Sequence, residues 1–385
     1  MMFYKIPVAW LQLTHNRTRL FVALAGIAFA VILIFMQMGL RAALFESAVR
    51  LHSNLQGEIF LISPRSTALI GMSQFSERRL LQALAFPEVE LVSPIYVDYG
   101  QWKNPQTGQT RQIFVTGFEP SDRIFQLPGV VQHTDQLTLP DTVLFDQASR
   151  PEFGPVAAQF RQDNAVNTEI EVRQVTVVGL FKMGASFGAD GNIMTSNVNF
   201  LRIFDRRTKG LIDIGLIRLK PLSNVNEVVA RMRRYFHEDV KVFTKQELID
   251  FEKNYWQTST AIGFIFDLGV VIGLIVGIVF VYQVLYTDVS HHLREYATLK
   301  AIGYSNNYLL YVVFQEAFIL AILGYIPGFA ITLGIYDLTL KATLLPIQME
   351  FVRAFNVQLL TIFMCFIGGL IAVTQLQKAD PADIF

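Results

Sequence analysis

Residues 20–40 read LFVALAGIAFAVILIFMQMGL, 21 residues without a charge, bounded by Arg19 and Arg41. A helix of this length crosses a hydrocarbon core of about 30 Å. The run is longer than the roughly 7–15 apolar residues of a cleaved signal peptide, and a long polar segment precedes it. It therefore predicts a retained membrane anchor.

Three further apolar runs follow later in the chain. Residues 261–286 contain one charge, Asp267, residues 308–334 contain one charge, Glu316, and residues 355–373 contain none. Only helices satisfy their backbone hydrogen bonds in lipid at this length and composition. The sequence predicts an α-helical membrane protein with four spans.

The long segment between the first two spans, residues 41–260, predicts one large α+β domain. Strand–helix–strand patterns recur at both of its ends, which indicates a core built from 41–120 and 211–260. Residues 121–210 are rich in strand patterns and predict a β-rich subdomain inserted into that core. The remaining segments are short: 1–19, 287–307, 335–354 and 374–385.

The orientation follows from Lys and Arg in the short segments. The side that holds both termini and the 287–307 loop carries six of them: Lys5, Arg17, Arg19, Arg294, Lys300 and Lys378. The opposite short loop carries two, Lys341 and Arg353. We therefore expect cytoplasmic termini and an extracytoplasmic large domain.

Composition excludes several classes of protein. Lys+Arg and Asp+Glu both number 32, so the basic surplus of a nucleic-acid binder is absent. A single cysteine, Cys365, rules out an intramolecular disulfide. The chain also contains no Gly-x-Ser-x-Gly or His-Glu-x-x-His motif. We expect no catalytic residue, no metal and no cofactor bound by this chain.

A glycine-rich stretch, Gly184–Gly191, follows a predicted strand. It lacks the Lys-Ser/Thr pair that ends a phosphate-binding loop, and no such motif stands elsewhere in the sequence. We interpret it as a flexible surface loop. His291-His292 is likewise interpreted as a solvated pair, since adjacent helical residues point about 100° apart.

Two features of the spans have both a functional and a structural interpretation. Asp267 and Glu316 are intramembrane carboxylates, which are costly and therefore suggest a proton or ion path. A structural hydrogen bond or a place near the interface explains them as well, and their predicted depths do not favour pairing. Gly269, Gly273 and Gly277 form one helix stripe, which indicates close packing within the chain or in a dimer.

The loop 287–307 carries the functional argument. Val289, Leu293, Tyr296 and Ala297 fall on one face of a short helix that Gly303 would end. Such a helix lies in the lipid head groups or inserts into a groove on a partner. Its mixed charges favour a protein partner. Residues 6–19 fit a second, interfacial helix.

The segment Arg294-Glu-Tyr-Ala-Thr-Leu-Lys-Ala-Ile-Gly-Tyr-Ser305 resembles the loop motif of the FtsX/MacB permease family. The tail Ala379–Phe385 and the entry Ala9-Trp-Leu-Gln-Leu…Asn16-Arg-Thr-Arg-Leu-Phe are similar to the family's two ends. The order of one span, an outer domain and three spans is also the family's. Within it, the chain most resembles the DevC-like permeases of cyanobacteria.

The resemblance implies a permease homodimer in a bacterial inner membrane, bound to two separate ABC ATPase subunits that hold ATP and Mg²⁺. It implies porter and sabre subdomains, a periplasmic adaptor, a TolC-like outer-membrane duct and contact with membrane lipids. A glycolipid cargo is implied only by the DevC likeness. The ATPase-coupling residues would be Leu293, Arg294, Glu295, Tyr296, Ala297, Lys300, Ala301 and Gly303.

The expected mechanism is mechanotransmission. Closure of the ATPase subunits would push on the coupling helix, and a continuous helix from Glu247 to Tyr286, about 60 Å long, would carry the displacement outward. Three alternatives stay open: an FtsX-like transmitter that activates cell-wall hydrolases, a LolC-like lipoprotein extractor, and an ion-coupled transporter that uses Asp267 and Glu316.

Overall fold

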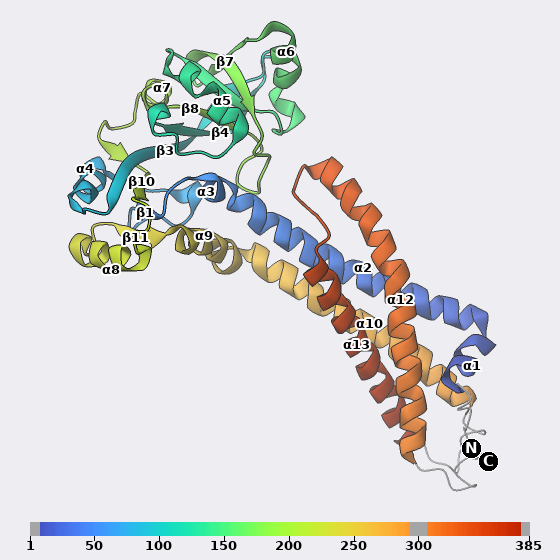
Figure 1. Cartoon of the computed structure of the whole chain (residues 1–385). Coiled ribbons are helices and arrows are strands. Elements are labelled where there is room, and N and C mark those ends of the chain that lie inside the picture. Colours follow the sequence, from blue (N-terminus) through green and yellow to red (C-terminus); the bar gives the residue numbers. More distant parts are fainter. Residues whose placement is uncertain (1–7, 293–305, 379–385) are drawn as a thin grey trace. The chain divides into compact units, whose positions relative to one another are not determined.

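The computed structural model describes residues 8–292 and 306–378. Its contacts divide the chain into two compact units (Figure 1). The helical unit comprises the described parts of 1–43, 262–342 and 347–385. The α/β unit comprises 44–261 with 343–346.

The helical unit contains four long apolar helices and one short helix at its start. The long helices are α2 (Arg17–Ala48), α10 (Ala261–His291), α12 (Asn306–Thr343) and α13 (Phe351–Lys378); the short one is α1 (Val8–His15). By length and composition, all four long helices can cross a membrane. The predicted fold class, four spans with a large domain between the first and second, is confirmed.

The helices extend beyond the apolar runs that predicted them. Helix α2 continues eight residues past Leu40, and α10 continues to His291, so residues 287–291 prolong the second span. Helix α12 reaches Thr343, well into the segment 335–354 that we expected to be a loop. The reason is that polar residues next to a span keep their helical hydrogen bonds once they leave the lipid.

Helix α2 packs closely against its neighbours within the helical unit. Its Ala30, Val31, Ile34 and Phe35 are completely buried. Glycines of α12 approach it, since a Cβ added at Gly324 would lie 2.5 Å from Ile27. In place of a hydrophobic effect between helices, such close backbone approach stabilises membrane bundles.

The α/β unit is built on a nine-stranded, mostly antiparallel sheet in the described part of the chain. The strand order is β11-β1-β10-β3-β4-β8-β5-β7-β6, with parallel pairs β4–β8 and β5–β7. The strands are β1 (Ile59–Ile62), β3 (Val89–Lys103), β4 (Thr110–Phe118), β5 (Thr142–Asp146), β6 (Val166–Ile170), β7 (Arg173–Phe181), β8 (Asn192–Ser196), β10 (Ile214–Leu219) and β11 (Lys241–Thr244). A small second sheet pairs β2 (Phe75–Ser76) with β9 (Leu211–Ile212).

Helices cover both faces of the large sheet, because its central strands alternate apolar residues between two cores. In β3, Tyr96 joins one core, whereas Ile95 and Val97 join the other. The first core contains residues of α4 (Glu77–Gln82), α6 (Val156–Asp163), α7 (Asn197–Ile203) and α8 (Val225–Phe236). The second contains residues of α3 (Arg50–Asn54), α5 (Pro128–His133) and α9 (Lys245–Asn254).

The segment 121–210, expected as an inserted subdomain, contributes β5, β6, β7 and β8 to the same sheet as its flanking segments. Its residues also share both cores with those segments. The strand-rich insertion is therefore continuous with the rest of the α/β unit.

The continuous helix predicted from Glu247 to Tyr286 is wrong. Helix α9 ends at Asn254, a π-helical turn η6 spans Tyr255–Ser259, and Thr260 is extended with φ −120° and ψ 155° before α10 begins. The π turn places Trp256 in the buried interior, where it is 5% exposed. Periodicity in the sequence does not report such a local break.

Candidate functional site

The predicted coupling residues, Leu293, Arg294, Glu295, Tyr296, Ala297, Lys300, Ala301 and Gly303, lie outside the described residues. The structure describes the helix ends next to them. Arg19 near the start of α2 and His291 at the end of α10 form a hydrogen bond, with 2.9 Å between Nη2 and Nε2. This contact joins the start of the first span to the end of the second span, which precedes the loop.

The glycine stripe of α10 packs against helices of the same chain. A Cβ added at Gly269 would lie 2.3 Å from Gln37 of α2, and one at Gly273 would lie 2.8 Å from Ile34. At Gly277 the nearest atom is the sulfur of Met364 in α13, 2.2 Å away. All three glycines thus permit close contact within the helical unit.

The two intramembrane carboxylates have different surroundings. Asp267 forms an ion pair with Arg41, with 2.5 Å between Oδ1 and Nη1, and both side chains are partly exposed. Glu316 is completely buried, and neither carboxylate oxygen has a hydrogen-bond partner within residues 8–292 and 306–378. Among the described residues, no contact joins the two carboxylates.

The glycine-rich stretch is not a flexible loop, which corrects the interpretation made from sequence. Asp146, completely buried at the end of β5, binds its first residues. One carboxylate oxygen accepts the N–H of Met183 at 3.0 Å, and the other accepts the N–H of Gly184 at 2.7 Å. Asn192 donates to the same carboxylate at 2.9 Å and to the Gly184 carbonyl at 3.0 Å.

The rest of the stretch is fixed as well. The Ser186 hydroxyl accepts the N–H groups of Gly188 and Ala189, and Tyr99 donates to the Gly188 carbonyl at 2.5 Å. Asp190 forms ion pairs with Arg111 and Arg150. Gly184 has φ +93°, a conformation that only glycine adopts without strain.

Beside this fixed loop lies a cleft of the α/β unit that sequence reasoning missed. Glu252 of α9, 1% exposed, accepts the N–H of Leu69 at 2.7 Å and the indole N–H of Trp256 at 2.9 Å. Burial raises the pKa of this carboxyl to about 7. The residues that line the cleft come from six separate segments, so no local pattern marks them.

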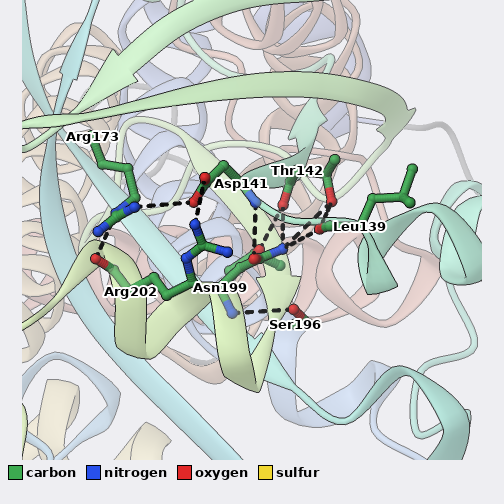
Figure 2. Close-up of polar contacts among 8 residues, drawn as sticks. Leu139, Asp141, Thr142, Arg173, Ser196, Asn199 and Arg202 are labelled. Atoms are coloured by element: carbon green, nitrogen blue, oxygen red, sulfur yellow. Dashed lines mark hydrogen bonds and ion pairs between the residues drawn. The ribbon is translucent and has the colours of Figure 1, made fainter.

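A second polar cluster lies where β7 begins and α7 ends (Figure 2). Asp141, with φ 56°, pairs with Arg202 at 2.9 Å and with Arg173 at 3.5 Å. Arg173 also donates to the Arg202 carbonyl at 2.7 Å. The adjacent groove measures about 310 Å³, and Val172 on its edge is 89% exposed.

Asn199 of α7 holds this cluster in place (Figure 2). Its side-chain oxygen accepts the Asp141 N–H at 3.0 Å, and its amide donates to the Leu139 carbonyl at 2.8 Å. Ser196 caps the helix by accepting the Asn199 N–H at 3.2 Å. The two arginines are therefore presented on a rigid base.

Four helices that can cross a membrane, with one α/β domain between the first and second in the sequence, define a multi-pass membrane protein. The model of the FtsX-like permease C-terminal domain matches residues 268–381, and the model of the MacB-like periplasmic core domain matches residues 20–235, more than half of the chain. The chain belongs to the FtsX/MacB permease family, whose members are permease components of ABC transporters. Membership implies an ABC ATPase as partner and a periplasmic α/β domain.

Three solved structures are similar to parts of the chain. The periplasmic region of MacB from Actinobacillus actinomycetemcomitans has a TM-score of 0.35 and 10% identity, covering 52% of this chain and 94% of its own. The extracellular domain of YknZ, a noncanonic ABC-type transporter from Gram-positive bacteria, has a TM-score of 0.34 and 11% identity, and the match covers 49% of this chain and 100% of that domain. A domain of a putative permease from Porphyromonas gingivalis has a TM-score of 0.31 and 14% identity, and the match covers 50% of this chain and 90% of that domain. The search of curated proteins found no match.

Proposed function

We propose that this chain is the permease subunit of a MacB-like exporter. Two copies would form a homodimer that binds two separate ATPase subunits at residues 293–303. ATP hydrolysis there would change the conformation of the periplasmic domains and drive a glycolipid or another amphiphile through an adaptor and an outer-membrane duct. The observation that carries the proposal is the pair of family matches, one over the spans and one over the periplasmic domain.

The route of force differs from the one expected from sequence, because α10 is separated from α9 by the extended Thr260. Helix α2 is the uninterrupted connection, since its residues up to Ala43 belong to the helical unit and those from Leu44 to the α/β unit. A displacement along α2 therefore reaches the periplasmic domain through a continuous helix. The hydrogen bond between Arg19 and His291 connects α2 to the end of α10 beside the coupling segment.

Inside the α/β unit, Lys245 connects the two segments that lead to the spans. Its ammonium group donates to the carbonyls of Ser53 and Leu55 at 2.9 and 2.8 Å. These carbonyls lie at the C-terminal end of α3, where a cation is favoured. The bonds support the proposal that α3 and α9 move together when α2 moves.

Two surfaces are assigned to partners in this proposal. The cluster of Asp141, Arg173 and Arg202 offers a rigid charged surface for the adaptor, with the exposed apolar side chain of Val172 at its edge. Apolar side chains of α10 such as Phe264 and Ile275 are more than half exposed, and they would face lipid or the second copy. The charge bias of the short segments supports cytoplasmic termini.

The test is to replace the coupling residues and to measure export with the ATPase present. Leu293→Glu and Glu295→Lys should each lower export several-fold while ATP hydrolysis by the partner continues. Glu90→Lys, at an exposed position of β3, is the matched control and should change neither. Unchanged export in both coupling variants would contradict the proposed docking role.

A further inference from the structure

The break between α9 and α10 is an ordered structure. Helix α9 ends at Asn254, and the π turn η6 and the extended Thr260 follow; we call residues 254–260 the elbow. The Thr258 hydroxyl donates to the Asn254 carbonyl at 2.8 Å. The Thr260 hydroxyl donates to the Trp256 carbonyl at 2.7 Å. Carbonyls freed at the end of a helix need partners, so these bonds give the elbow a defined conformation.

A buried carboxylate connects the elbow to a distant segment. Glu252 lies on α9, four residues before Trp256, and is 1% exposed. One of its oxygens accepts the indole N–H of Trp256 at 2.9 Å, and the other accepts the backbone N–H of Leu69 at 2.7 Å. Leu69 begins the 3₁₀ turn η1 (Leu69–Gly71) and precedes Glu252 by 183 residues. Both oxygens of one carboxylate thus hold the elbow and η1 together.

The elbow and η1 face a narrow space inside the α/β unit. The space is lined by Glu252, Trp256 and Leu69, and by Ser47 and Ala48 at the end of α2; we call these five residues the joint. Only about 30 Å³ of the space admits the centre of a water molecule, so it suits no ligand of several heavy atoms. Close-packed protein is nearly incompressible, so a displacement of one wall shifts the walls that touch it.

The turn η1 leads from the joint to the large sheet. A Cβ added at Gly188 would lie 2.6 Å from the side chain of Ile70, so η1 touches the fixed glycine-rich stretch. Tyr99 of β3 donates to the Gly188 carbonyl at 2.5 Å. Strand β3 pairs with both β10 and β4 in the middle of the sheet. The joint is therefore connected through η1 to the central strands of the α/β unit.

We propose that Glu252 is a positioning residue, which fixes the elbow and transmits displacements of α10 to η1. The proposal rests on the proposed function for the source of the displacement. Helix α2 enters the α/β unit as a continuous helix, whereas α10 acts on that unit through the elbow. The α/β unit then receives two inputs, one along α2 and one through Glu252.

The first test measures hydrogen exchange of the full chain in nanodiscs without nucleotide. Glu252→Gln presents an NH₂ group to one of the two donors, so the Leu69 N–H, read from peptides covering 66–73, should exchange at least about tenfold faster. Trp256→Phe removes only the indole N–H and should speed the same exchange at least about threefold, because the joint couples the two bonds. Asp250→Asn, at an exposed position of α9, is the matched control and should change nothing.

A pH profile separates positioning from simple packing. Burial raises the pKa of the Glu252 carboxyl to about 7, and the ionised form accepts both N–H groups as charge-assisted bonds. Protection of the Leu69 N–H, corrected for the intrinsic rate, should therefore increase from about pH 6 to pH 8, and Glu252→Gln should remove this increase.

The other titratable groups near Glu252 keep one charge state over this range. They lie on the elements packed against α9 and in the lining of the narrow space: Arg50 and His52 of α3, Tyr99 of β3 and Lys241 of β11. Burial lowers the pKa of His52 to about 4 and raises that of Tyr99 to about 12, and the arginine and lysine stay charged. The expected profile therefore reports on Glu252.

The second test adds the co-purified ATPase with ATP and vanadate. Exchange in peptides covering 66–73 should then change in the unsubstituted chain but not in Trp256→Phe. Unchanged exchange in Glu252→Gln without nucleotide, a flat pH profile, or an equal nucleotide response in Trp256→Phe would each overturn the proposal. Failure of the proposed function looks different, because nucleotide would then alter no peptide while the differences without nucleotide would remain and support the role of Glu252 in fixing the elbow.

Discussion

Two buried carboxylates show how differently the two units treat charge. Asp146 in the α/β unit accepts hydrogen bonds from the backbone of Ala148, Met183 and Gly184 and from the side chain of Asn192. Glu316 in α12 is equally buried but has no hydrogen-bond partner in the described part of the chain. Asp146 organises its surroundings, whereas Glu316 occupies a position that the described packing does not require to be polar.

The largest expected effect follows from removing the bonded carboxylate. Asp146→Ala leaves three backbone N–H groups and one amide without their acceptor in a dry site, which should lower the free energy of unfolding by about 3–5 kcal/mol. Glu316→Gln should change it by less than about 1 kcal/mol. Chemical unfolding of the full chain in nanodiscs, followed by tryptophan fluorescence, measures both. Equal effects of the two substitutions would break the comparison.

The pH dependence of stability gives a second test of how buried groups with and without hydrogen-bond partners behave. Burial lowers the pKa of His52 from 6.5 to about 4, and neither ring nitrogen has a described partner. As pH falls from 6.5 to 4, the unfolded chain binds a proton that the folded chain refuses, so up to about 3 kcal/mol of stability is lost. His52→Leu should remove this contribution, so that the free energy of unfolding at pH 4.5, relative to pH 7.5, exceeds that of the unsubstituted chain by up to about 3 kcal/mol.

The buried carboxyl of Glu252 changes stability with pH in the opposite direction. Burial raises its pKa from 4.5 to about 7, so between these values the folded chain keeps a proton that the unfolded chain releases. Stability therefore falls as pH rises from 4.5 to 7, again by up to about 3 kcal/mol. Because the two contributions nearly cancel between pH 4.5 and 6.5, the unsubstituted chain should change little there, whereas Glu252→Gln should leave the rise of stability with pH and His52→Leu should leave the fall. If either single substitution left the pH dependence of the free energy of unfolding unchanged, the pKa of the replaced group would not be shifted by folding.

In the helical unit, close packing replaces polar networks, and a smaller effect is expected. Gly273→Val should lower stability by about 1–3 kcal/mol, because the added carbons meet Ile34 and the backbone of α2. Gly334→Val is the matched control, since no atom lies within 4 Å of an added Cβ there. Thermal unfolding of both variants in nanodiscs compares them. Equal losses would place the α10–α2 contact in doubt.

The smallest effect concerns the partly exposed ion pair of the helical unit. Asp267→Asn removes the charge that pairs with Arg41, and both side chains are at least one-third exposed. We expect a loss of about 1 kcal/mol or less, because exposed ion pairs contribute little. Export should survive this substitution combined with Glu316→Gln. Abolished export with a folded double variant would instead support an ion-coupled mechanism.

The sequence predicted what uninterrupted patterns encode. The four apolar runs located the spans, and strand–helix–strand patterns located the α/β unit, because both are local signals. The helix ends at Ala48 and Thr343 were missed, since polar residues continue a helix without an apolar pattern. The break at Thr260 was missed as well, because the π turn before it, with its buried Trp256, follows no apolar pattern.

The candidate sites were predictable only where one segment carries them. The glycines of α10 form a stripe that spacing alone reveals. The fixed state of Gly184–Gly191 depends on Asp146, 38 residues earlier than Gly184, and no local signal connects the two. The partner of Asp267 is Arg41, 226 residues away, which marked only the end of the first apolar run.

The central claim is that a separate ATPase drives this chain through residues 293–303. The direct measurement is to purify the chain from its native membranes, identify the proteins that accompany it, and assay ATP hydrolysis with and without them. We predict an accompanying ABC ATPase, hydrolysis only in its presence, and loss of the association in Glu295→Lys. Hydrolysis by the chain alone, or an ATPase that binds the Glu295→Lys variant equally well, would contradict the account.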